Sequence, residues 1–250
     1  MNLSGTTALI TGGGTGIGLA LAEALIKEGG QVLICGRTEE TLARAQEQLP
    51  GLEYKVCDVS DEGDREALFE WVKLRHPGMD LLINNAGIQN EINFRKGLED
   101  LEAGDNEILS NLESAIYLTA RFIPHLLGQT EAAVVNVTSG LAFVPLALMP
   151  VYCATKAGLH SFSQSLRHQL ASTPIKVFEL IPPTVDTGLD KGARGRRGQT
   201  DRGIAPKEVA AAAVAGMRKD LWEIPVGRAQ GLMQGARSDP DGAFKGLNRI

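Results

Sequence analysis

The sequence has few cysteines, no long uninterrupted apolar run and no excess of positive charge. Its three cysteines, Cys35, Cys57 and Cys153, are odd in number and lack the spacing of a metal site. We therefore expect reduced thiols in a cytoplasmic protein. Proline or charged residues interrupt the longest apolar stretches, so we predict no membrane-spanning segment and no membrane partner. The N-terminus also lacks the charged and apolar regions of a signal peptide.

The balance of charge argues against a nucleic-acid partner. Among 250 residues, 25 lysines and arginines stand against 30 aspartates and glutamates, which gives a formal net charge of −5. Binding to nucleic-acid phosphates would need a basic footprint. The hydrophobic fraction of 43% is enough for a sizeable core. We predict that residues 1–250 form a single domain, since an α/β domain of this length is ordinary.

Short β-branched runs alternate with helical patterns along the chain, which is typical of βαβ units and a parallel sheet. We predict strands at residues 7–11, 31–36, 53–59, 80–84, 132–139, 176–181 and 223–227. We predict helices at residues 16–28, 39–48, 61–75, 105–127, 152–171 and 206–219. Several of the strands are apolar on both faces, as expected when helices cover both sides of a sheet. The predicted fold class is therefore α/β, with a doubly wound parallel sheet of the Rossmann type.

Two segments depart from this alternation. Residues 188–203 are rich in glycine and arginine and have no periodicity, and we interpret them as a mobile loop over the substrate. The arginines of this loop would suit an anionic group. Residues 228–250 carry scattered glycine, proline and aspartate, and we predict an irregular C-terminal tail. A loop and a tail without a functional role are the alternative.

A glycine-rich turn follows the first predicted strand and opens the first predicted helix. Its spacing, Gly-x-x-x-Gly-x-Gly, differs from the general dinucleotide fingerprint. Glycine permits backbone angles that side chains forbid, and the start of a helix offers N–H groups and a positive dipole end to phosphates. An ordinary strand–helix connection is the alternative. We predict that the turn binds a dinucleotide cofactor through Gly12, Thr15, Gly16, Ile17 and Gly18.

The end of the second predicted strand bears on the choice of cofactor. An acidic residue in this neighbourhood typically binds the ribose hydroxyls of NAD, whereas this chain has Gly36 and Arg37. A guanidinium can bind a 2′-phosphate bidentately. Glu39 and Glu40 count slightly against this, but they suit the first turn of a helix. We therefore predict NADP(H) as the preferred cofactor, with NAD(H) as the alternative.

Tyr152 and Lys156 form a Tyr-x-x-x-Lys pair, a motif of little value alone. Its value comes from Ser139 and Asn111, which lie upstream at compatible places. Reduction of a carbonyl needs a proton donor at the developing alkoxide, and a phenol with a pKa near 10 is a poor base for the reverse reaction. Residues four apart on a helix share a face, so we expect Lys156 to lower the pKa of Tyr152. For each residue alone, a structural role is the alternative.

In order and spacing, these motifs resemble those of the short-chain dehydrogenase/reductase family. The resemblance implies a sheet of order 3-2-1-4-5-6-7, nicotinamide chemistry at the carboxyl ends of its strands, and a homodimer or homotetramer. It runs from Thr6 to about Thr187 and rests on Thr11-Gly-Gly-Gly-Thr-Gly-Ile-Gly18, Cys57-Asp-Val59, Asn84-Asn-Ala-Gly87, Asn111, Ser139 and Tyr152-x-x-x-Lys156.

The resemblance also implies a role for each matching residue. Ser139 would fix the substrate oxygen, Asn111 would hold a water in a proton relay, and Lys156 would bind the nicotinamide ribose. Asp58 and Val59 would border the adenine. The further cofactor contacts that it implies are Asn85, Ala86, Gly87, Tyr152, Pro182, Val185 and Thr187.

One departure from the family pattern is informative. The family usually has Pro-Gly after the sixth strand, whereas this chain has Pro182 and Pro183. Proline removes a backbone donor and stiffens the turn, which changes the expected geometry around the nicotinamide. This variant resembles a branch of the family that is named for D-alanine esterification of cell-wall polymers.

These observations predict an oxidoreductase that transfers a hydride between a nicotinamide and a carbonyl or alcohol centre of a small molecule. Tyr152 would be its general acid or base. A catalytically silent regulator that senses NADP is the alternative. We predict no metal site, because His160 and His168 have no third ligand in the sequence pattern and suit polar positions of a helix.

Overall fold

Within residues 1–190, 192–198 and 200–248, which this computed structural model describes, seven parallel strands form one sheet. Their bounds are β1 Thr7–Thr11, β2 Gln31–Gly36, β3 Glu53–Val56, β4 Leu81–Asn84, β5 Ala132–Val137, β6 Ile175–Ile181 and β7 Glu223–Pro225. The order β3-β2-β1-β4-β5-β6-β7 confirms the predicted topology. The strand order reverses between β1 and β4, and in open α/β sheets a crevice forms outside the carboxyl ends at such a point.

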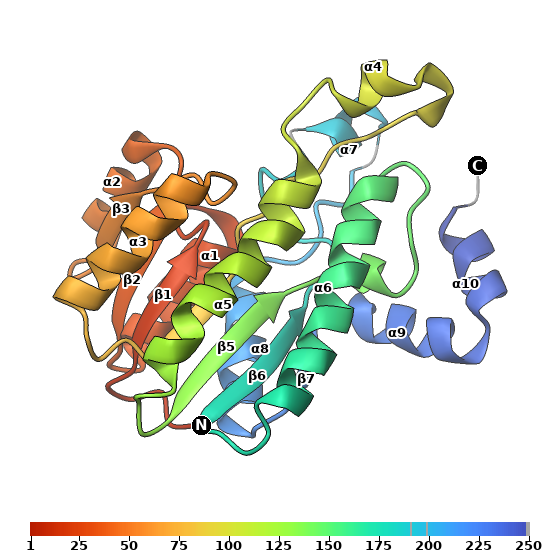
Figure 1. Cartoon of the computed structure of the whole chain (residues 1–250). Helices are drawn as coiled ribbons and strands as arrows, with labels where there is room; N and C mark the ends of the chain where they lie inside the picture. Colours follow the sequence, from red (N-terminus) through yellow and green to blue (C-terminus); the bar gives the residue numbers. More distant parts are fainter. Residues whose placement is uncertain (191, 199, 249–250) are drawn as a thin grey trace.

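Six long helices within the described residues cover the two faces of the sheet (Figure 1). Their bounds are α1 Gly16–Lys27, α2 Glu39–Gln48, α3 Glu62–Arg75, α5 Ser114–Leu126, α6 Pro150–Gln169 and α8 Pro206–Arg218. One large apolar cluster joins the sheet to α1, α2 and α8, and a second joins it to α3, α5 and α6. None of the helices in the described ranges has both the length and the apolarity to cross a bilayer.

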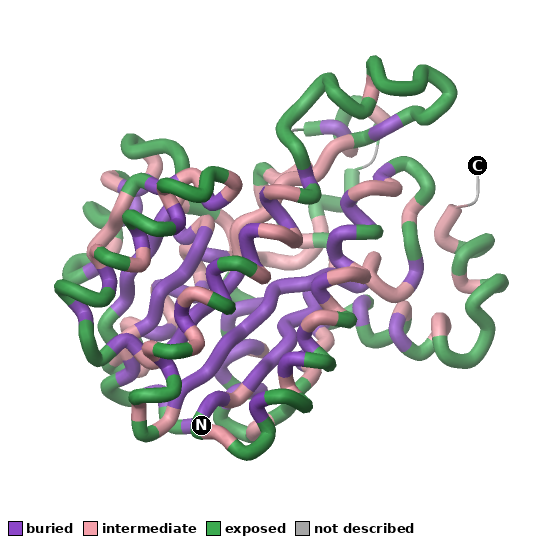
Figure 2. Tube along the Cα trace, in the orientation of Figure 1, coloured by how far each residue is buried: buried purple, intermediate pink, exposed green. Residues whose placement is uncertain are grey.

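The strands bury side chains on both of their faces. Successive residues of a strand point to opposite sides, so Leu9 packs under α3 and α5 while Ile10 packs under α1 and α8. Both side chains are fully buried. Figure 2 shows buried residues running along the central strands and the inner sides of the helices. The apolar runs of the sequence are explained by this double cover.

Three strands end earlier than predicted. β7 ends at Pro225 rather than at residue 227, and the early ends of the other two place candidate residues beyond the sheet. β3 ends at Val56 rather than at residue 59, and β5 ends at Val137 rather than at residue 139. Asp58 turns the chain, because its Oδ1 accepts hydrogen bonds from the backbone N and Oγ of Ser60. Ser139 begins a 3-10 turn, because its Oγ accepts a hydrogen bond from Leu141 N at 3.1 Å.

The predicted helix over residues 105–127 begins two residues later than predicted and is irregular in its first half. The regular helix α5 is preceded by a π-helical turn, Leu109–Glu113, which contains the buried Asn111. Single π-helical turns inside helices often occur at functional sites. The segment before this turn, with the short helix α4 Leu98–Leu101, projects from the body of the molecule (Figure 1).

The predicted irregular tail 228–250 is helical where it is described. It contains α9 Arg228–Ser238 and α10 Pro240–Leu247. The start of α10 had a signal in the sequence, since Asp239 is its N-cap and its carboxylate accepts a hydrogen bond from Gly242 N. The predicted loop 188–203 contains the short helix α7 Ala193–Arg196. Residues 191 and 199 of that loop and 249–250 of the tail lie outside the described residues.

Candidate active site

A cleft of about 2480 Å³ lies at the carboxyl ends of the strands and collects most of the candidate residues. A smaller pocket of about 290 Å³ adjoins it and contains Arg37, Asp58 and Val59, together with part of the glycine turn. The candidate residues that line the large cleft are Gly12, Thr15, Gly16, Ile17, Asn85, Ala86, Gly87, Ser139, Tyr152, Lys156, Pro182, Val185 and Thr187. Two other candidate residues, Gly18 and Asn111, line neither the cleft nor the smaller pocket.

The glycine turn packs so tightly that side chains would not fit. Gly12 has a φ of +63°, and a Cβ on it would lie 2.9 Å from the Cα of Ala86. A Cβ on Gly18 would lie 2.3 Å from the carbonyl oxygen of Gly12, so Gly18 allows the turn to fold on itself. Thr11 fixes the turn to the end of β4, because its Oγ1 accepts hydrogen bonds from Asn85 N and Ala86 N at 3.0 Å.

The start of α1 suits an anionic group. Thr15 is the N-cap, its side chain makes no capping hydrogen bond, and the first turn contains no acidic residue. The backbone N–H groups of this turn therefore face the cleft without a competing carboxylate. Thr187 approaches the same place, since a Cβ on Gly16 would lie 3.0 Å from its Cγ2. The close backbone approach and the free helix N-terminus together suit the diphosphate of a dinucleotide.

Arg37 lies in the smaller pocket and already has a carboxylate partner. Its Nη1 is 2.8 Å from Asp105 Oδ2, and both side chains are 48% exposed. The hydrogen bond to Asp105 raises the pKa of Arg37, and the charge of Asp58 adds to this effect. Sequence reasoning missed Asp105, because nothing local connects it to a residue so far upstream. Such exposed pairs contribute little stability and are readily exchanged for another anion.

Tyr152, Lys156 and Ser139 meet on the floor of the cleft, and all three are buried. Tyr152 and Lys156 come from the first turns of α6, and Ser139 comes from the end of β5. The Nζ of Lys156 donates a hydrogen bond to Val137 O at 2.8 Å and lies 5.8 Å from the centre of the Tyr152 ring. The structure therefore brings together the proton donor, the cation and the hydroxyl that the sequence predicted as a set.

The pKa of Tyr152 moves in the direction opposite to the one expected. Burial raises it, because the phenolate loses its hydration, and a hydrogen bond with Ser139 lowers it only in part. Burial also lowers the pKa of Lys156 to about 8. The net lowering that was expected from Lys156 is thus wrong, because the effect of burial is larger. The phenol is held in its protonated form, which is the form that a proton donor needs.

The side-chain amide of Asn111 forms hydrogen bonds with the backbone of Ile88 and with the hydroxyl of Thr155. Its Oδ1 accepts a hydrogen bond from Ile88 N at 2.8 Å, and its Nδ2 donates to Ile88 O at 2.9 Å. Its Nδ2 also donates to Thr155 Oγ1 at 3.2 Å. A Cβ on Gly87 would lie 3.4 Å from Asn111 Oδ1 and 3.6 Å from Lys156 Nζ. Asn111 therefore anchors the segment after β4 beside the ammonium group, and its part in a water relay stays a prediction.

The C-terminal helices form a wall of the cleft that sequence reasoning missed. Leu232 of α9 and Leu247 of α10 line it, and Asn248 ties this wall to the segment after Ser139. The Oδ1 of Asn248 accepts a hydrogen bond from Ala147 N at 2.6 Å, and its Nδ2 donates to Pro145 O at 3.0 Å. This part of the cleft is therefore shaped by the segment that was predicted as an irregular tail.

Another group that sequence reasoning missed surrounds His160. Its ring lies beside Glu179 of β6 and Glu223 of β7, and one ligand atom from each of the three lies within 4.8 Å of the others. The sequence pattern had shown no third ligand, because the two glutamates come from strands that are neighbours only in the folded sheet. His168 is exposed on the same helix. Hydrogen bonds already engage His160 and Glu179, and a metal does not follow from this group.

The chain belongs to the short-chain dehydrogenase family. The family model described as "short chain dehydrogenase" matches residues 6–197. The chain is 50% identical, over 248 residues, to a Bacillus subtilis (strain 168) protein named "Uncharacterized oxidoreductase DltE", with 99% of this chain and 98% of that protein covered. This likeness confirms the branch that the proline pair suggested. The chain is also 29% identical over 228 residues to an uncharacterized oxidoreductase of Staphylococcus saprophyticus, with 88% of this chain and 94% of that protein covered.

Solved structures share the fold. A short-chain dehydrogenase from Burkholderia cenocepacia J2315, in complex with NADP, superimposes with a TM-score of 0.84 at 26% identity and covers 99% of both chains. A short-chain dehydrogenase/reductase from Burkholderia phymatum, in complex with NAD, gives a TM-score of 0.86 at 21% identity and covers 100% of this chain and 98% of that one. The second likeness bears on the fold alone.

Proposed function

We propose that the protein is an NADP-preferring oxidoreductase that interconverts a carbonyl and an alcohol on a small molecule, with Tyr152 as the general acid or base. One observation carries the proposal: Tyr152, Lys156 and Ser139 converge on the floor of a cleft whose other wall is the glycine turn. Membership of the short-chain dehydrogenase family supports it. A short-chain dehydrogenase that is 26% identical to this chain is solved in complex with NADP.

The residues present suit a nicotinamide dinucleotide. The glycine turn and the start of α1 would hold its diphosphate, and Asp58 and Val59 would border its adenine. Gly87 would lie near the ribose beside Lys156, and Thr187 would approach the nicotinamide end. When bound, this cofactor supplies or accepts the hydride.

The side chains on the floor of the cleft would transfer the proton and stabilise the groups that exchange it. In the reduction, the O–H of Tyr152 donates a hydrogen bond and then its proton to the oxygen of the substrate carbonyl. The hydroxyl of Ser139, which is hydrogen-bonded with Tyr152, would fix the position of that oxygen. Lys156 is charged below a pKa of about 8 and would stabilise the phenolate that proton donation leaves behind.

The preference for NADP rests on Arg37. Its guanidinium lines the pocket that would receive the adenosine, and its partner Asp105 is half-exposed. A 2′-phosphate carries more charge than a carboxylate and offers three oxygens to a guanidinium. We therefore expect the phosphate to displace Asp105 from Arg37.

Equilibrium titration with NADPH and NADH, followed by turnover on a panel of small carbonyl compounds, tests the proposal. Tyr152→Phe is expected to bind NADPH and to lose turnover, whereas Tyr117→Phe, on an exposed tyrosine of α5, keeps it. Arg37→Ala is expected to weaken NADPH binding about 10-fold or more without affecting NADH, since hydrogen bonds to charged groups are worth about 1.5–3 kcal/mol. Arg44→Ala, on an exposed arginine of α2, is the matched control.

The outcomes separate the alternatives. Tight NADPH binding with turnover that Tyr152→Phe abolishes supports the oxidoreductase. Tight binding without turnover on any member of the panel would favour the silent regulator instead. Equal affinity of wild type and Arg37→Ala for NADPH would remove the basis for the NADP preference. Light scattering tests the further proposal that the protein is a homodimer or homotetramer, which a strict monomer would contradict.

A further inference from the structure

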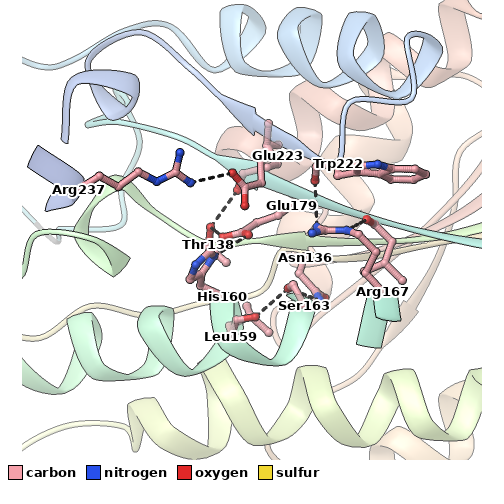
Figure 3. Close-up of polar contacts among 12 residues, drawn as sticks. Asn136, Thr138, Leu159, His160, Ser163, Arg167, Glu179, Trp222, Glu223 and Arg237 are labelled. Carbon is pink, nitrogen blue, oxygen red and sulfur yellow. Dashed lines mark hydrogen bonds and ion pairs between the residues drawn. The ribbon is translucent and has the colours of Figure 1, made fainter. Parts of the chain in front are cut away.

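Glu179 is a fully buried carboxylate on β6, the strand next to the edge strand β7, and both of its oxygens are engaged. Its Oε1 accepts a hydrogen bond from Thr138 Oγ1 at 2.7 Å, and its Oε2 accepts one from His160 Nδ1 at 2.8 Å (Figure 3). Thr138 follows β5, Glu179 belongs to β6, and His160 belongs to α6. One buried side chain therefore joins two strands and a helix.

The two partners of Glu179 are next to the residues of the candidate active site. Thr138 immediately precedes Ser139. His160 follows Lys156 by one helical turn and Tyr152 by two, and residues at this spacing share one face of a helix. The contacts of Glu179 therefore fix the strand end that presents Ser139 against the helix face that presents Tyr152 and Lys156.

Charged groups on four elements surround His160. Glu179 of β6 and Glu223 of β7 face it, Arg167 lies about two turns further along α6, and Arg237 of α9 pairs with Glu223 at 3.4 Å. The hydrogen bond to Glu179 raises the pKa of His160, and burial and Arg167 oppose this. The ring of Phe143, from the segment after Ser139, lies 4.5 Å from the imidazole and shields it from one side.

A neutral hydrogen bond between side chains also holds α6 against the sheet. Asn136 of β5 donates a hydrogen bond from Nδ2 to Ser163 Oγ at 2.9 Å, and it accepts one from Asn84 Nδ2 at 2.8 Å. This neutral contact already joins α6 to the sheet. Burying a charged pair has a large desolvation penalty, and well-packed apolar residues often replace such a pair without loss of stability. A contact with a buried carboxylate beside the neutral one therefore calls for an explanation other than stability.

We propose that Glu179 and His160 are positioning residues, which clamp the helix of Tyr152 and Lys156 to the strand end of Ser139 and so set the geometry of proton transfer. The kinetic part of this proposal rests on the proposed function. Small displacements of reacting groups have large effects on rate, and neither residue lines the cleft, so both act through the residues that they hold.

Substitutions at His160 separate the hydrogen bond from the bulk of the ring. His160→Leu removes the donor to Glu179, whereas His160→Asn keeps an N–H donor near the place of Nδ1. We expect His160→Leu to lower kcat about 10- to 100-fold on a carbonyl that the wild type reduces, with an unchanged Kd for NADPH. His160→Asn should keep most of the wild-type kcat. His168→Leu, on an exposed histidine of the same helix, is the matched control and should match the wild type.

Hydrogen exchange of peptides from residues 150–160 gives a readout that needs no substrate. Exchange in this segment should increase in His160→Leu and remain low in His160→Asn and His168→Leu. Unchanged exchange in His160→Leu overturns the clamp, whether or not the protein shows turnover. Equal loss of kcat in the Leu and Asn variants, or a parallel loss of NADPH binding, overturns positioning in favour of a merely structural role.

Tyr152→Phe keeps the two proposals apart. If Tyr152→Phe is as active as the wild type, the proposed function fails, while hydrogen exchange still decides the clamp. If Tyr152→Phe is inactive and His160→Leu retains the kcat of His168→Leu, the proposed function stands and the positioning role fails.

Discussion

The ammonium group of Lys156 donates a hydrogen bond to the carbonyl oxygen of Val137 at 2.8 Å, which ties the helix of Tyr152 to the last residue of β5. Lys156 is only 4% exposed, and burial lowers its pKa to about 8. The protein therefore keeps a cation in a place where hydration is lost. Such an arrangement is characteristic of functional sites, because it sacrifices stability for chemistry.

Lys156→Met is expected to stabilise the cofactor-free protein at pH 7 and to abolish turnover. The folded pKa of about 8 is below the ordinary 10.5, so the unfolded chain binds more protons between these values and wild-type stability rises with pH there. The advantage of Lys156→Met should shrink from pH 8 to 10.5. At pH 7 it is at most about 3 kcal/mol, since one pKa unit corresponds to about 1.4 kcal/mol. Thermal unfolding across this range measures it, and a pH-independent difference would contradict the prediction.

Gly12→Ala is expected to weaken NADPH binding about tenfold or more, since every 1.4 kcal/mol of lost binding free energy is tenfold in Kd. The new Cβ would lie 2.9 Å from the Cα of Ala86, and the φ of +63° is unfavourable for alanine by about 1–2 kcal/mol. Isothermal titration gives the affinity, and chemical unfolding gives the stability. Gly78→Ala is the control, because a Cβ on Gly78 would meet no atom within 4 Å. An affinity for NADPH equal to that of the control would show that the turn does not hold the diphosphate.

Local secondary structure and contacts between distant residues were not equally predictable from the sequence. Elements with a local signal, such as the buried strands and the helix that carries Tyr152 and Lys156, were predicted well. Contacts between residues far apart in sequence were not. Arg37 pairs with Asp105, and His160 meets Glu179, only because the sheet order brings separate elements together. The family resemblance implied the order of the strands. Which side chains meet also depends on the conformation of the turns, which the hydrophobic periodicity of the sequence does not predict.

The missed helices α9 and α10 illustrate a different limit. Both contain two glycines and are largely exposed, with two buried residues in α9 and none in α10. Their position depends instead on specific contacts, such as those of Asn248 with Pro145 and Ala147. Sequence reasoning finds helices through the face that they bury, and these helices bury little.

Asp80→Asn is expected to stabilise the protein increasingly as the pH rises from 4 to 6. Burial raises the pKa of Asp80 from 3.8 to about 6, although Thr7 N donates a hydrogen bond to its Oδ1. The folded protein then binds more protons than the unfolded chain in this window, so wild-type stability is lost as the pH rises through about 6. Asparagine can still accept from Thr7 and does not titrate. Unfolding midpoints at several pH values test this, with exposed Asp241→Asn as control; a constant difference would contradict the assignment.

An ion pair between Glu91 and Arg197 joins the segment after β4 to the loop 188–203, and the two side chains are 37% and 24% exposed. Arg197 and the neighbour of Glu91, Ile92, both line the cleft, so this pair connects two of its walls. We expect Glu91→Gln to raise the KM of the carbonyl substrate about two- to fivefold, because partly exposed pairs contribute up to about 1 kcal/mol.

Salt separates this effect from a general change in the loop. At high ionic strength the wild type should approach the KM of Glu91→Gln, since salt screens exposed ion pairs. Asp100→Asn weakens the pair with Lys96 in the same projecting segment but keeps an oxygen acceptor for Asn93 N. Neither Lys96 nor Asp100 lines the cleft, so this variant should leave KM unchanged. A rise in KM that is equal in both variants would mean that the whole segment, rather than the contact between the walls, determines substrate binding. A rise confined to Glu91→Gln and abolished by salt would identify the pair as the contact that holds the cleft in its binding form.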